Sequence, residues 1–159
     1  MLHVENLRKS FGPVRALDGI SFSVGKGEIV GFLGPNGAGK TTAMRIIAGF
    51  LSAGEGRVTL DGVDVADDPV AVKAKVGYLP EQPPLYPELR VREYLAFVAG
   101  LKGVPKKEVA ERVDEAMHSV KITERADQII RSLSKGYKQR VGLAGALVHR
   151  PPILILDEP

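Results

Sequence analysis

Hydrophobic and polar positions follow different periods in different parts of the chain. Residues 1 to about 75 read as short strands and turns. Alternating strands over 57–60 and 63–65 flank Asp61-Gly62, which predicts a β-hairpin. A turn at Asp18-Gly19 is expected before another alternating strand over 21–24.

Three apolar runs have no such alternation. Residues 28–33, 76–79 and 153–156 are short and continuously apolar, which is typical of strands buried in a parallel sheet. The first run leads into a glycine-rich loop and then into residues 41–48, whose apolar spacing predicts a helix. Strands followed by helices of this kind predict an α/β protein.

Helical periodicity dominates the second half. Apolar residues at helical spacing predict helices over 91–101, from Pro105 to about Val120, and over about 136–148. The last of these begins after Ser134, a favourable capping residue. Residues 91–133 therefore predict a helical insert between strand-rich parts.

Composition narrows the class of protein. The sequence has 159 residues, no Cys and a net charge of +3 from 22 basic and 19 acidic residues. The absence of Cys excludes disulfides and thiolate metal sites, and the small charge gives no argument for nucleic acid. With no long apolar window and no signal-peptide pattern, we expect a soluble cytosolic chain that can dock on a membrane partner.

The glycine-rich loop carries the most specific signal. It fits the pattern G-x-x-x-x-G-K-[ST] between a strand and a helix, which predicts a phosphate-binding loop. Lys40 is expected to reach the β- and γ-phosphates, and the Thr41 hydroxyl to ligate Mg²⁺. The loop residues are Gly34, Pro35, Asn36, Gly37, Ala38, Gly39, Lys40 and Thr41.

Two acidic residues follow the last apolar run. At the end of a buried strand, Asp157 can hold Mg²⁺ through water. Glu158 is expected to point the other way and to accept a proton from an attacking water. With Lys40 and Thr41, these residues predict Mg²⁺-dependent phosphoryl transfer.

A second phosphate-binding turn is expected around Ser134 and Gly136, at the start of the last helix. One phosphate chain does not need two such turns from one subunit. Two subunits paired head to tail would each contribute one turn.

Together these motifs resemble the nucleotide-binding subunit of ATP-binding cassette (ABC) transporters. Residues 34–42, which include Thr42, resemble the Walker A motif, 154–158 Walker B, and 133–137 with Gln139 and Arg140 the signature motif. Phe11 falls where the family places an aromatic residue that stacks on adenine. Residues 77–95 are similar to stand-alone ATPase subunits of bacterial and archaeal exporters.

The resemblance implies a P-loop NTPase fold with a RecA-like core. That core would comprise residues 1–80 and 134–159, with an antiparallel β subdomain and a helical subdomain over 81–133. Two subunits would sandwich two ATP molecules with Mg²⁺, and would drive a transmembrane permease subunit from the cytoplasmic face of the membrane. Glu158 and Lys40 would be the catalytic residues, and no nucleic acid is expected.

Three positions depart from the family pattern. Glu81 stands where the family usually has a Gln that contacts Mg²⁺, with Gln82 next to it, and we favour Glu81 as the ligand. In the signature motif, Lys135 replaces a Gly and Tyr137 replaces a Gln.

The C-terminus departs more strongly. The family continues past the Walker B glutamate with further strands, one of them central, and with a switch His. His3, His118 and His149 do not match that His and are expected to be ordinary surface residues. We therefore expect a fragment that lacks the C-terminal part of the core and that, alone, binds ATP poorly and does not hydrolyse it.

Two other functions remain open at this point. One is a soluble ABC-type ATPase that acts on nucleic acid or the ribosome. The other is a non-catalytic module or inactive fragment, against which Lys40 and Glu158 argue.

Overall fold

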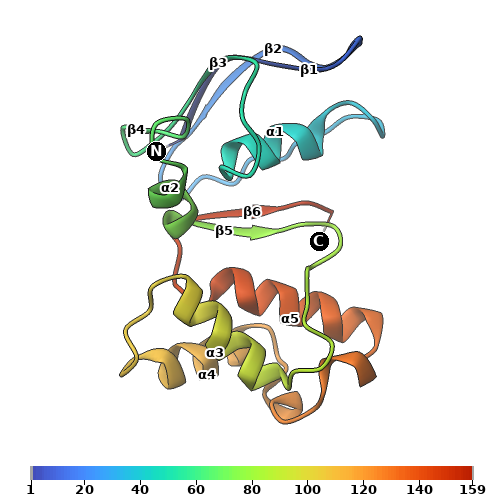
Figure 1. The fold of residues 1–159 in the computed structure, drawn as a ribbon, viewed down its shortest axis with the longest axis vertical. Coiled ribbons are helices and arrows are strands. Elements are labelled where there is room, and N and C mark those ends of the chain that lie inside the picture. Colours follow the sequence, from blue (N-terminus) through green and yellow to red (C-terminus); the bar gives the residue numbers. More distant parts are fainter. Residues whose placement is uncertain (1, 159) are drawn as a thin grey trace. The chain divides into compact units, whose positions relative to one another are not determined.

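The computed structural model describes residues 2–158. The chain divides into two compact units, Met1–Lys73 and Ala74–Pro159, and each is described by itself. Figure 1 shows the element order along the chain. Helix α2 (Pro69–Lys75) contains the boundary between the units.

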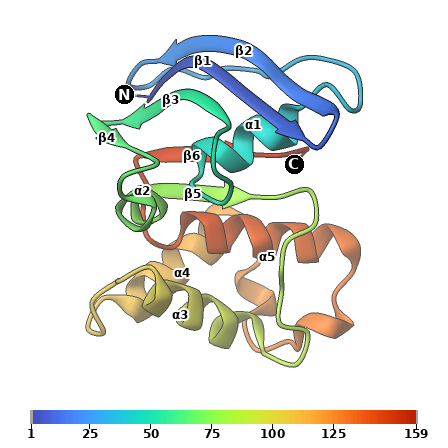
Figure 2. The same cartoon turned by 45° about the horizontal axis from the view of Figure 1, so that its top comes forward.

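The first unit is built on an antiparallel sheet. It contains β1 (Leu2–Phe11), β2 (Val14–Val24), β3 (Glu55–Leu60) and β4 (Val63–Asp64), in the order β2-β1-β3-β4. Helix α1 (Lys40–Ile47) lies beside this sheet (Figure 2). The buried side chains of these elements are Leu2, Val4, Leu7, Leu17, Ala43, Ile46, Ile47, Val58 and Leu60.

The predicted hairpin at Asp61-Gly62 is confirmed. Leu60 pairs with Val63, and both turn residues have positive φ, as a two-residue hairpin turn requires. The predicted turn at Asp18-Gly19 is wrong, because β2 runs through it. The β1–β2 register shifts there, and Gly19 (φ 81°) forms an irregularity where an added Cβ would lie 2.8 Å from the Asn6 side chain.

The buried strand expected over 28–33 is not formed. Ile29 and Leu33 are 101% and 96% exposed, and Phe32 makes an edge-to-face contact with Phe22 at 5.0 Å. A strand requires a neighbour that pairs with its N–H and C=O groups. Among residues 2–158, no strand pairs with residues 28–33.

The second unit combines a short parallel sheet with a helical layer. Strands β5 (Val76–Leu79) and β6 (Ile153–Leu156) pair in register, from Val76–Ile153 to Leu79–Leu156. The helices are α3 (Val91–Leu101), α4 (Val109–Ser119) and α5 (Lys135–Leu147), with 3-10 turns η1 (Thr123–Arg125) and η2 (Ile130–Ser132). All three predicted helices are confirmed, although α4 begins later than Pro105.

The three helices share one apolar core. Its fully buried side chains include Val91, Leu95, Val113, Met117, Ile130 and Val141. Helix α3 begins where the Glu93 carboxylate accepts a hydrogen bond from the Arg90 N–H at 2.8 Å. The division into residues 1–80 plus 134–159 and 81–133 stays a prediction.

One glycine in α5 allows close packing. A Cβ on Gly142 would lie 2.6 Å from the Pro83 ring, whereas one on Gly145 would make an ordinary van der Waals contact, 3.5 Å from the Tyr94 ring. The Pro83 contact explains a glycine that is otherwise unfavourable inside a helix. The Gly142 contact also fixes the loop after β5 against α5.

Candidate nucleotide-binding site

The glycine-rich loop is held in place by the sheet of the first unit. Gly39 is the N-cap of α1 and has a φ of 84°. A Cβ at this position would lie 2.2 Å from the Ala16 carbonyl oxygen and 2.8 Å from the Leu17 side chain. Only glycine combines this conformation with so close an approach, so the loop is fixed against β2.

The N-terminus of α1 is arranged for an anion. No side chain caps the helix, and its first turn contains no acidic residue. The first backbone N–H groups of a helix have no partner within the helix, and they carry the positive end of its dipole. A phosphate group is a suitable partner for them.

Lys40 brings a positive charge into the loop. Its Nζ donates hydrogen bonds to the carbonyl oxygens of Gly34 at 2.7 Å and Pro35 at 2.9 Å. The ammonium group therefore closes the loop on itself. Thr41 follows at the exposed start of α1, and Thr42 is half-buried.

Phe11 belongs to the same unit as the loop. It ends β1 and is 50% exposed. The Lys9 ammonium lies 5.5 Å from its ring centroid and donates a hydrogen bond to the Ser52 carbonyl at 2.7 Å. The exposed half of the ring is available for stacking.

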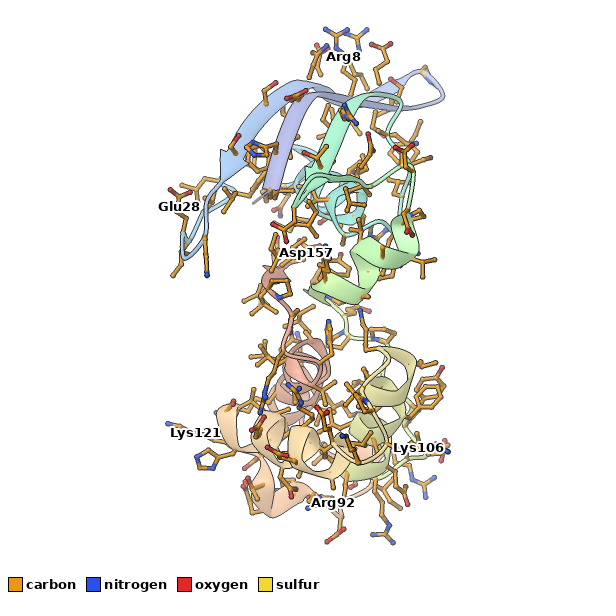
Figure 3. All side chains as sticks on the ribbon, turned by 90° about the vertical axis from the view of Figure 1, so that its left-hand side faces the viewer. Arg8, Glu28, Arg92, Lys106, Lys121 and Asp157 are labelled. Carbon is orange, nitrogen blue, oxygen red and sulfur yellow. The ribbon has the colours of Figure 1, made fainter. Side chains whose placement is uncertain are left out.

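Asp157 and Glu158 differ sharply in exposure. Asp157, which Figure 3 labels, is 2% exposed, and its N–H donates to the Leu79 carbonyl at 2.9 Å. Glu158 is exposed and has a φ of 51°, so the extended backbone of β6 ends there.

Glu81 and Asp157 follow the same edge of the short parallel sheet. Leu79 pairs with Leu156, so the residues after the two strands leave the sheet at one end. Glu81 and Gln82 are both exposed, and their exposure does not distinguish them.

The oxygen donors fit Mg²⁺. A hydroxyl and carboxylates are hard ligands, and Mg²⁺ usually keeps several waters and nucleotide phosphates around one or two protein groups. Within residues 2–158, no cluster of three or more His, Asp or Glu residues is suited to hold a metal.

Ser134 caps α5 as expected. Its Oγ accepts a hydrogen bond from the Tyr137 N–H at 3.4 Å. A Cβ on Gly136 would meet no atom within 4 Å, so this turn is open to approach.

The structure thus brings the loop and Phe11 into the first unit. It brings Glu81, Ser134, Asp157 and Glu158 into the second. Sequence reasoning missed the Gly39 contact with β2, because the partner lies on another element. His149 is not the ordinary surface residue that was expected. Burial, together with the charge of Lys102, lowers its pKa to about 4.

Comparison with known proteins decides the family. The ABC transporter family profile matches residues 17–159. The chain belongs to the ABC transporter family. The resemblance to this family and the P-loop NTPase fold class are confirmed by this match and by the solved structure below.

Two curated relatives come from Bacillus subtilis (strain 168). The linearmycin resistance ATP-binding protein LnrL is 40% identical over all of this chain and 51% of its own length. The SkfA peptide export ATP-binding protein SkfE is 42% identical over all of this chain and 66% of its own length. This chain spans about half the length of the first of these relatives.

A solved structure is similar in fold. It is the dimeric, post-hydrolysis state of the ATP-binding cassette MJ0796 bound to ADP and Pi, with a TM-score of 0.88 and 27% identity. The match covers 98% of this chain and 73% of that one. Among residues 2–158, none of the helices has the length and apolar character needed to cross a bilayer.

Proposed function

We propose that the protein binds and hydrolyses ATP and thereby drives transport through a separate transmembrane permease subunit. The observation that carries this proposal is the loop over residues 34–41. This loop contains a helix N-terminus with no side-chain cap, a glycine fixed against β2 and the Lys40 ammonium. Such a loop is suited to bind the phosphates of a nucleoside triphosphate.

The first unit would bind the nucleotide. The N–H groups of the loop from Gly34 to Thr42, except at Pro35, which has none, would surround the phosphates. Lys40 would exchange its two carbonyl partners for the β- and γ-phosphate oxygens. Phe11 stacks on the adenine with its exposed face. The Thr41 hydroxyl would ligate Mg²⁺, which would supply positive charge to balance the phosphates.

The second unit would supply the groups for hydrolysis. Asp157 would hold the metal through water, with Glu81 as a further ligand. The exposed Glu158 carboxylate accepts a proton from the attacking water.

The turn at Ser134 and Gly136 would act on the ATP of a second subunit. Its open approach and its helix N-terminus support a phosphate contact. A head-to-tail dimer is consistent with the dimeric structure of the related cassette MJ0796.

Transport rests on the named relatives. The names of LnrL and SkfE describe ATP-binding proteins of linearmycin resistance and of peptide export. By analogy, the protein acts at the cytoplasmic face of the membrane as a peripheral subunit. No observation favours the alternative of an ATPase that acts on nucleic acid or the ribosome.

Two measurements test this proposal. A fluorescent ATP analogue with Mg²⁺ should bind the native protein, and Lys40→Ala should abolish binding. Purification from membranes should recover the protein with a hydrophobic subunit. Binding that survives Lys40→Ala would contradict the nucleotide assignment, and isolation with nucleic acid or ribosomes instead would contradict the transport assignment.

A further inference from the structure

Tyr137 lies in the first turn of α5, and two guanidinium groups approach its ring. The Cζ atoms of Arg125 and Arg140 lie 4.8 Å and 5.8 Å from the ring centroid. Cations at this distance are attracted to the electron-rich face of an aromatic ring. Tyr137 and Arg140 belong to the segment that resembles the signature motif, but the proposed chemistry gives no role to this cluster.

The cluster fastens α5 to the segment before it. The Tyr137 hydroxyl donates a hydrogen bond to the Glu124 carboxylate at 3.2 Å. Arg140 Nη1 donates to the Lys121 carbonyl at 3.4 Å, where the chain leaves α4 (Figure 3 labels Lys121). The first two turns of α5 are therefore held against residues 121–125.

The charges of the cluster are partly balanced. Two guanidinium groups around one ring repel each other, but the Glu124 carboxylate lies 3.8 Å from Arg125 Nε. Arg125 Nη1 also donates to the Gln128 side chain at 3.1 Å. The aromatic ring thus sits in a network whose other members already have fixed partners.

The network connects directly to Ser134. The backbone N–H of Tyr137 is the group that donates to the Ser134 Oγ. A ring held in place fixes this N–H, and the N–H in turn orients the serine hydroxyl. A glutamine at this position, as the family pattern has, could not offer an aromatic face to the two guanidinium groups.

We propose that Tyr137 is a positioning residue. Its ring, held by Arg125, Arg140 and Glu124, sets the turn at Ser134 and Gly136 for contact with the nucleotide of the second subunit. This inference rests on the proposed function, because it assumes that two subunits enclose ATP.

The first experiment measures ATP-dependent self-association in a Glu158→Gln background, which slows hydrolysis. Adding Tyr137→Leu should weaken association about tenfold, because both cation–π contacts are lost. Tyr137→Phe keeps the ring and should weaken association only about twofold. Tyr86→Leu, an exposed tyrosine of the same unit outside the cluster, should leave association unchanged.

Affinity for a fluorescent ATP analogue in dilute protein separates positioning from general damage. It should change less than about twofold in Tyr137→Leu, because the loop over 34–41 belongs to the other unit. Association equal to the parent, an equal loss in Tyr86→Leu, or a matching loss of ATP affinity would each overturn the proposal.

A second experiment needs no nucleotide. In Tyr137→Leu, hydrogen exchange at the backbone amides of positions 137 and 138 should accelerate about tenfold, while the amides of α3 keep their rates. If the parent protein does not self-associate when ATP is present, the dimer of the proposed function is wrong. The exchange measurement still tests whether Tyr137 holds the first turn of α5. Unchanged exchange at these two amides would overturn its positioning role.

Discussion

Lys40 is expected to contribute strongly to nucleotide binding and little to the stability of the fold. Its ammonium donates hydrogen bonds to the carbonyls of Gly34 and Pro35, and it lies on the loop rather than in a core. Lys40→Met should therefore lower ATP affinity by at least about a hundredfold, through lost charge-assisted bonds to phosphate. Titration with a fluorescent ATP analogue gives the affinity.

The matched control for Lys40 is Lys9→Met in the same unit. Stability of Lys40→Met should stay within about 1 kcal/mol of the parent, since the lost bonds are exposed. A large fall in stability, or an equal loss of ATP affinity in Lys9→Met, would contradict this role for Lys40.

His149 should make stability depend on pH. Burial and the Lys102 charge lower its pKa from 6.5 to about 4 in the folded chain. The unfolded chain therefore binds more protons between these values, and stability is lost as pH falls from about 6.5 toward 4. After allowance for partial exposure, the loss is about 1–2 kcal/mol.

Urea unfolding at pH 7 and pH 5 measures this effect. His149→Asn should reduce the difference between the two pH values, whereas His118→Asn, on the exposed face of α4, should keep it. The range from pH 5 to pH 7 lies above 4.5, the ordinary pKa of a glutamate carboxyl. Glu115 therefore does not titrate within it, because its hydrogen bond to Arg150 lowers its pKa further. An unchanged difference in His149→Asn would show that another group titrates.

The sequence predicted the roles of Lys40 and Ser134 but not that of His149. Lys40 follows a motif whose spacing alone indicates a phosphate loop, and Ser134 follows the rule for helix caps. His149 was taken for a surface residue, because its burial and the nearby charge of Lys102 come from elements distant in sequence.

At the scale of elements, the packing of α5 against the loop after β5 depends on one glycine. A Cβ on Gly142 would lie 2.6 Å from Pro83 and 2.9 Å from Leu79. Gly142→Ala should destabilise the protein by about 1–3 kcal/mol, because the rigid proline ring has to move. Urea unfolding with constant m-value measures this change.

Gly100→Ala in α3 is the control for Gly142→Ala. An added Cβ there would meet no atom within 4 Å, so the helix should gain up to about 1 kcal/mol from better propensity. Loss of stability in both variants would point to a general intolerance of side chains rather than to the Pro83 contact.

Periodicity predicted the helices well, because each apolar stripe faces one shared core. It failed at residues 28–33 and at Asp18-Gly19. The apolar run identified a segment suited to burial, but a strand also needs a neighbour in register, and no local pattern reports whether one is present. Gly19 was predicted to lie in a turn because Asp-Gly is a turn signal, but a glycine with positive φ also suits a β-bulge.

At the scale of the whole molecule, the active form of the protein is expected to be a dimer. The loop over 34–41 and the turn at Ser134 lie in different units, and each would act on a different ATP molecule. ATP turnover per subunit should therefore rise with protein concentration, and Ser134→Ala should lower it at least about tenfold. Turnover independent of concentration across the dissociation range would contradict a shared site.

The most direct test of the central claim is steady-state hydrolysis of Mg²⁺-ATP by the native protein together with the transmembrane subunit proposed as its partner. We expect hydrolysis in the parent and a loss of at least about a hundredfold in both Lys40→Ala and Glu158→Gln. Glu158→Gln should still bind ATP, because its loop is intact, whereas Lys40→Ala should not. Hydrolysis that persists in both variants would show that these residues do not form the site of ATP turnover.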